Sequence, residues 1–72
     1  MMEKIEATVT GRVLEILVQV GSKVNVGDDV AKIESMKMEI PVSAEYAGTV
    51  TAVAISIDDS VEEGQVIIEL EG

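Results

Sequence analysis

The strongest constraint on the fold is an internal repeat. Shifting the sequence by 37 positions aligns residues 5–34 with residues 42–71 without a gap. Two copies within 72 residues are too short to be separate domains, so we expect residues 1–72 to form one domain with approximate twofold symmetry. Six aligned pairs are identical: Ala7/Ala44, Gly11/Gly48, Val13/Val50, Val24/Val61, Gly27/Gly64 and Glu34/Glu71.

The apolar residues of each copy alternate with more polar ones, which is the side-chain period of a β-strand. The alternation covers Ile5–Val9 and Leu14–Val20 in the first copy, and the matching positions of the second copy repeat it. A short apolar run follows in each copy, at residues 30–34 and 66–70. Residues that tolerate positive φ separate these runs and predict turns: Gly21, Gly27, Gly64 and the pair Asp58-Asp59.

No segment keeps the 3.6-residue apolar period of an amphipathic helix, so several short strands and no long helix are expected. Each copy is too small to bury its own apolar face. The two copies are therefore expected to pack face to face as an all-β flattened barrel or sandwich.

Composition excludes several kinds of chemistry. The chain has neither cysteine nor histidine, which removes disulfides, thiolate metal sites and the commonest general base. A net charge of −9 disfavours nucleic acid and anionic membranes and favours a basic partner. The chain shows neither a signal peptide nor an apolar stretch of the roughly 20 residues that span a bilayer, so we expect a cytoplasmic protein. We also expect a monomer. With one aromatic residue among 47% hydrophobic residues, Val, Ile, Leu and Met are expected to fill the core.

Three minor features have structural interpretations. The acidic pairs 28–29, 58–59 and 62–63 lack the alternating ligands of a calcium loop and predict solvated turns. Tyr46 aligns with Val9 and is expected to pack inward. Pro41 lacks a backbone donor, which favours an edge strand or a bulge.

Between the copies lies the one internal segment without a counterpart, Ser35–Pro41. Strand-like residues flank it, so it is expected to form the tip of a hairpin. It contains none of the Asn-Gly or Asp-Gly pairs that favour tight hairpin turns, which suggests that something other than turn stability selected it. If the twofold relation holds, Lys37 lies at the pole opposite the chain ends.

Met36 and Met38 flank this lysine and allow two interpretations. They could fold back onto the barrel, with Lys37 then an ordinary solvated charge, and the residues alone favour this. Alternatively, the flexible and polarisable methionines form a surface that partner proteins recognise.

The run Glu34-Ser35-Met36-Lys37-Met38-Glu39 resembles the attachment motif of the biotinyl/lipoyl domain family, usually written Glu-Ala-Met-Lys-Met. The resemblance implies a barrel-sandwich hybrid of two pseudo-twofold-related four-stranded sheets. No long Ala/Pro-rich linker or inserted thumb accompanies the match, so the chain is similar to free-standing biotin/lipoyl attachment proteins. Further similar positions extend over nearly the whole chain: Gly11, Val20-Gly21, Val24, Gly27, Ala47-Gly48-Thr49-Val50, Val61 and Gly64.

The resemblance implies that Lys37 is covalently acylated and that Met36 and Met38 are read by the attaching ligase. In lipoylated members the lysine usually follows an aspartate, whereas Met36 precedes it here. Biotin is therefore the expected cofactor, with lipoate as the alternative.

The resemblance also implies the partners. A biotin protein ligase would attach biotin, and Lys37 would present it to a biotin carboxylase and a carboxyltransferase. The domain itself would be a ligase substrate and carrier, with no catalytic residues and no metal. Two alternatives remain: a lipoyl carrier modified by a lipoyl ligase on the same lysine, and an unmodified acidic module that binds a basic partner.

Overall fold

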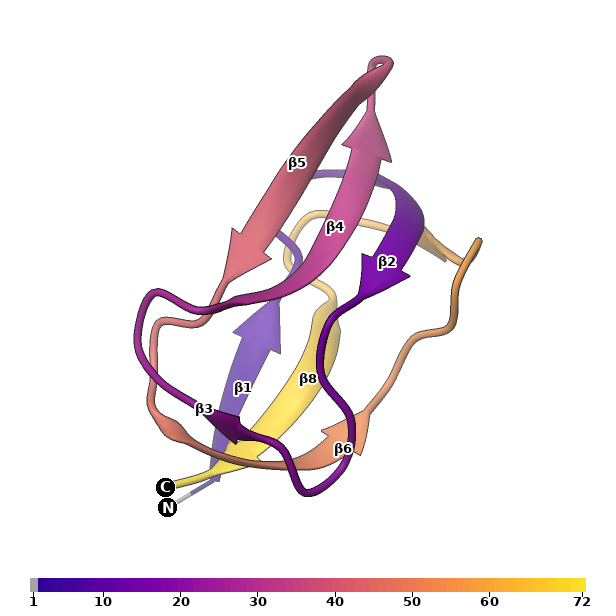
Figure 1. Cartoon of the computed structure of the whole chain (residues 1–72). Coiled ribbons are helices and arrows are strands. Elements are labelled where there is room, and N and C mark those ends of the chain that lie inside the picture. Colours follow the sequence, from indigo (N-terminus) through magenta and orange to yellow (C-terminus); the bar gives the residue numbers. More distant parts are fainter. Residues whose placement is uncertain (1) are drawn as a thin grey trace.

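The computed structural model describes residues 2–72, which form eight β-strands and no helix (Figure 1). Within this range there is accordingly no helix that could span a membrane. The short strands and the absence of a long helix confirm the prediction. The strands are β1 (Met2–Glu6), β2 (Gly11–Ile16), β3 (Lys23–Val24), β4 (Asp29–Ser35), β5 (Met38–Ser43), β6 (Gly48–Val53), β7 (Ser60–Val61) and β8 (Val66–Glu71).

The strands form two four-stranded antiparallel sheets, with orders β1-β8-β6-β3 and β5-β4-β2-β7. The 37-residue shift converts one order into the other, which confirms the twofold relation. However, each sheet takes two strands from each copy. The two copies are therefore interleaved, a feature that the sequence analysis did not predict.

The symmetry extends to irregularities of the backbone. The β2–β4 register shifts between Val13 and Glu15, and the β6–β8 register shifts at the matching residues Val50 and Ala52. Hydrogen bonds between segments repeat in the same way: Gly64 N donates to Ala7 O at 2.8 Å, and Gly27 N donates to Ala44 O at 2.9 Å. The repeat thus describes backbone geometry as well as composition.

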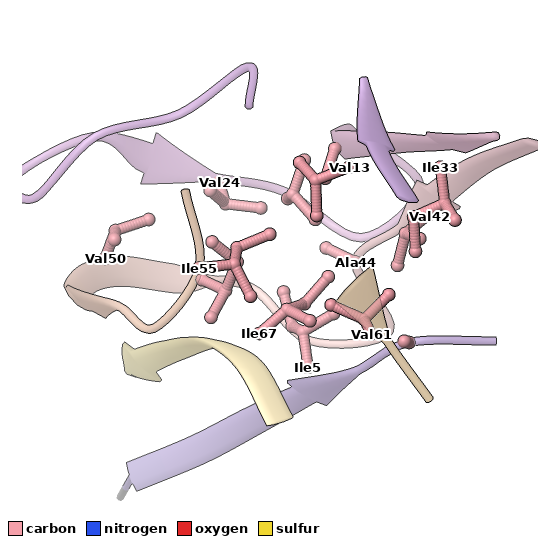
Figure 2. Packing of buried hydrophobic residues seen from close by; sticks show 14 of the residues in the cluster. Ile5, Val13, Val24, Ile33, Val42, Ala44, Val50, Ile55, Val61 and Ile67 are labelled. Atoms are coloured by element: carbon pink, nitrogen blue, oxygen red, sulfur yellow. The ribbon is translucent and has the colours of Figure 1, made fainter. Parts of the chain in front are cut away.

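An apolar core fills the space between the sheets (Figure 2). Among the described residues, no polar or charged side chain is buried. Because the bulges bend the strands, consecutive residues such as Ile67 and Ile68 both face inward. The core consists of Ile, Val, Leu and Ala only: Ile5, Ala7, Val13, Val24, Val30, Ala31, Ile33, Val42, Ala44, Val50, Ile55, Val61, Ile67, Ile68 and Leu70.

Three packing expectations were wrong. The described methionines, at positions 2, 36 and 38, lie outside the core; Met1 lies outside the described residues. Tyr46 is 40% exposed, because a buried phenol would need a hydrogen-bond partner that this apolar core lacks. The apolar alternation of Leu14–Val20 does not continue as one strand. β2 ends at Ile16, because the chain leaves that sheet there to reach β3 in the other.

The predicted turns are confirmed. Gly21, Gly27 and Gly64 have φ near +90°, and Asp58, which aligns with Gly21, has φ +74°. Side chains of the acidic pairs stabilise these turns, since Asp28 Oδ2 accepts a hydrogen bond from Asn25 N, and Asp59 Oδ2 accepts one from Ser56 N. These carboxylates are engaged by the backbone, as expected of solvated turns.

Gly11 is required by close approach rather than by a special φ. A Cβ at this position would collide with the backbone carbonyl oxygen of Glu34 on β4. Because Gly11 has no side chain, β2 lies directly against the last residues of β4, the strand that leads to Lys37.

We predict that Gly11→Ala lowers the free energy of unfolding by more than about 2 kcal/mol, because a rigid backbone atom cannot move aside. Gly21→Ala is the matched control: its Cβ would meet open space, and only the positive φ costs about 1 kcal/mol. Urea unfolding of both variants checks this, and equal losses would contradict the close contact.

Candidate functional site

The site is the tip of the β4–β5 hairpin, which extends beyond the rest of the molecule (Figure 1). Ser35 pairs with Met38 across the hairpin, which leaves Met36 and Lys37 as a two-residue turn. The two chain ends lie together at the opposite end of the molecule, where Met2 pairs with Glu71. The predicted placement of Lys37 opposite the ends is therefore confirmed.

The backbone of this turn is strained. Met36 has φ +53° and Lys37 has φ +65°. Positive φ at both central residues is the requirement of a type I′ hairpin turn, which normally selects Asn and Gly. A non-glycine residue in this region of positive φ lowers the stability of the fold by about 1 kcal/mol or more. The sequence retains Met and Lys here at a cost in stability, as the missing turn chemistry suggested.

The side chains at the tip point into solvent. Met36 is 91% exposed and Met38 is 61% exposed. The interpretation in which both methionines fold back onto the barrel was wrong, because a two-residue turn at the end of a protruding hairpin places them beyond reach of the core. Lys37 is exposed between them, and within the described range it forms no ion pair. The surface interpretation of the methionines is the one that the geometry supports.

The hairpin itself is held firmly behind the tip. Ile33 on β4 and Val42 on β5 are fully buried. Pro41 lies on β5, which is an edge strand, the place in a sheet where a residue without a backbone donor is tolerated. The lysine therefore rests on a rigid support, and its mobility comes from its own side chain.

One arginine contributes to this support, and the sequence reasoning missed it. An Arg12 nitrogen on β2 donates to Glu34 Oε1 at 3.1 Å, and a second Arg12 nitrogen lies 3.7 Å from Asp58 Oδ1. Glu34 also faces Glu39 across the hairpin, so Arg12 offsets a like-charge pair. The 37-residue shift could have revealed this role. It aligns Arg12 with Thr49 and Asp58 with Gly21, so each charged residue stands where the other copy has an uncharged one. Within residues 2–72, this charged cluster thus occurs at the lysine pole and has no counterpart at the other.

The tip lies apart from a hollow in the described surface. This hollow, of about 440 Å³, lies between the end of β1 and the residues around Tyr46. Among residues 2–72, no three acidic side chains converge as metal ligands do. An exposed amine in this setting can act as a nucleophile toward an acyl group that another protein activates and delivers.

Fold and site together define a small all-β domain that presents one lysine on a strained two-residue turn. A family described as "Biotin-requiring enzyme" matches residues 1–70. The chain belongs to this biotinyl/lipoyl domain family.

Two curated relatives match most of their own length. The chain is 42% identical over 67 residues to the biotinylated protein TB7.3 homolog of Mycobacterium leprae, covering 93% of this chain and 94% of that protein. It is also 42% identical over 60 residues to the biotin/lipoyl attachment protein of Bacillus subtilis, covering 83% and 82%. Both relatives are small proteins of similar extent.

A solved structure shows the same fold within a large enzyme. The Kluyveromyces lactis urea carboxylase superposes with a TM-score of 0.91 and 32% identity over 99% of this chain. The match covers only 6% of that carboxylase chain. The barrel-sandwich fold predicted from the resemblance is therefore confirmed.

We predict that the double substitution Met36→Asn with Lys37→Gly raises the free energy of unfolding by about 1 kcal/mol, because both residues accept positive φ. Met36→Leu with Lys37→Arg keeps the strained backbone and should leave stability unchanged. Thermal unfolding of the two variants beside the unmodified wild type checks the difference, and no gain from Asn-Gly would argue against a strained tip.

Proposed function

We propose that residues 1–72 are a single biotin carrier domain and that biotin is attached to the Nζ atom of Lys37. The observation that carries this proposal is the exposed lysine on the two-residue turn, supported by a rigid hairpin and flanked by exposed methionines. Lys4, Lys23 and Lys32 lie on strands, and none lies between methionines. Membership in a family described by its need for biotin supports the choice of cofactor.

Met36 and Met38 are the residues that a biotin protein ligase reads, together with the turn itself. Exposed thioethers contribute nothing to the core, yet they offer apolar surface that a partner can cover. Because their backbone positions are fixed by the hairpin, a ligase meets the lysine and both methionines in one arrangement. This explains why strained residues are kept where Asn-Gly would be more stable.

In the attachment reaction, the ligase activates the acyl group and Lys37 supplies the nucleophile. The neutral Lys37 amine attacks the carbonyl carbon of a biotinyl-adenylate, the new C–N bond forms, the bond to phosphate oxygen breaks, and AMP leaves with release of the amine proton. The lysine loses its positive charge, so the net charge changes from −9 to −10. The protein is the substrate of this reaction.

The carrier then serves two active sites. Biotin supplies a site that accepts a carboxyl group at a biotin carboxylase and releases it at a carboxyltransferase. The contribution of this chain is presentation: the rigid barrel keeps one long arm at high local concentration near both sites. The similarity to a domain of a urea carboxylase supports a carboxylase partner.

The second candidate is a lipoyl carrier. The observation in its favour is a relative named for both cofactors, the biotin/lipoyl attachment protein, which shares 42% identity with this chain. The same turn and lysine would serve, with a lipoyl ligase as partner. Met36, where lipoylated members usually have aspartate, favours biotin.

We expect one biotinyl group on Lys37 alone when the protein is incubated with biotin protein ligase, ATP and biotin, as measured by intact and peptide mass spectrometry. Parallel incubation with lipoyl ligase and lipoate tests the second candidate. Modification by neither ligase would overturn both carrier functions and leave the acidic interaction module.

Lys37→Arg and Lys37→Ala are expected to accept no biotin and to keep the wild-type melting temperature, because Lys37 contacts nothing in the core. Lys32→Arg on the same hairpin is the matched control and should be biotinylated normally. Loss of folding in the Lys37 variants would indicate a structural role for this lysine.

A further inference from the structure

We propose that Met36 and Met38 form a peroxide-sensitive modification site that slows acylation of Lys37 when the two thioethers are oxidised. The inference rests on the proposed function, because it concerns the recognition of this turn by the ligase. It goes further in assigning the methionines a regulatory chemistry of their own.

Exposure makes these sulfur atoms accessible to an oxidant. Met36 is 91% exposed and Met38 is 61% exposed, and they lie within one turn of each other. Oxidation of methionine depends on access to the thioether, so both side chains are open to peroxide dissolved in the surrounding water. Met2, which is 54% exposed at the opposite end of the molecule, provides an internal reference.

The reaction needs only a peroxide. A sulfur lone pair attacks one peroxide oxygen, the S–O bond forms as the O–O bond breaks, and the departing hydroxide takes up a proton to give water. Sulfur is oxidised to the sulfoxide and the peroxide is reduced. Methionine sulfoxide reductases supplied with a thiol reductant reverse this change, since the thiols are oxidised to a disulfide as the sulfoxide oxygen leaves as water, so the site can return to its original state.

The fold tolerates this modification because neither thioether is part of the core. Oxidation commonly damages proteins by placing a polar group among packed side chains. Here the described core contains only Ile, Val, Leu and Ala, and the tip protrudes from it. The sulfoxides would remain in water, and the barrel would keep its stability.

The ligase complex is affected differently. A ligase that encloses Lys37 must also cover the flanking side chains, because the two-residue turn holds all three together. Covering a thioether removes apolar surface from water, which is favourable, whereas covering a sulfoxide removes a strong hydrogen-bond acceptor from water. The same exposed pair that favours recognition in the reduced form therefore opposes it in the oxidised form.

The test begins with wild-type protein treated with hydrogen peroxide and mapped by peptide mass spectrometry. We expect one added oxygen on Met36 and on Met38, an unchanged melting temperature, and initial biotinylation slowed about tenfold or more, the effect of burying an unpaired polar group. Treatment with the two methionine sulfoxide reductases should restore the original rate.

Two variants separate this effect from general damage. Met36→Leu with Met38→Leu cannot form sulfoxides at the tip, so its biotinylation rate should be the same before and after peroxide. Met2→Leu should lose activity as the wild type does. If the leucine pair is a poor ligase substrate, reversal by the reductases decides the question.

The outcomes distinguish this inference from the proposed function. Equal biotinylation of reduced and doubly oxidised protein would overturn the inference and leave the carrier function intact, and so would failure of the reductases to restore the rate. Absence of biotinylation in the reduced protein would overturn both.

Discussion

The structure depends on the interleaving of its two copies around a dry apolar core. Each sheet contains two strands from each copy, so neither copy has a complete sheet of its own. Paired hydrogen bonds, such as Gly21 N to Val50 O and Asp58 N to Val13 O, join the copies at matching places. Burial of the core requires both copies at once, which lets a chain of this size form one stable domain without disulfides. It also provides the rigid base on which the lysine turn stands.

Departures from the symmetry mark the function. Most of the chain obeys the 37-residue relation in strands, bulges and turns, and three of the exceptions lie at one pole. The turn of Met36 and Lys37 has no counterpart, Arg12 stands where the other copy has Thr49, and Asp58 keeps a positive φ where its counterpart is Gly21. Side chains required only for folding would be expected in both copies. These side chains lie at one end of the molecule, the end that carries Lys37.

Much of the fold could be predicted from the sequence, because the internal repeat indicates a twofold relation and the two-residue apolar period indicates β-strands. The turns at Gly27 and Gly64, the hairpin around Lys37 and the edge position of Pro41 followed from local chemistry. The interleaving did not, because periodicity carries no information about which strands are neighbours. The exposure of Tyr46 was also missed, since an apolar side chain in an alternating pattern does not reveal where a strand leaves its sheet. Arg12 was missed because its partners are distant in sequence.

The pairing of Met2 with Glu71 bears on how many turns like that of Met36 and Lys37 the fold can contain. The 37-residue shift relates this pair to Glu39 and Glu34, which frame the lysine turn, so the paired ends of β1 and β8 occupy the position of a second, unjoined hairpin tip. The architecture therefore has two equivalent corners, of which one is closed by a turn and the other is open. A single closed turn of this kind is a property of the duplicated topology itself, and the open corner leaves both strand ends facing away from Lys37, where further polypeptide could be joined without disturbing that turn.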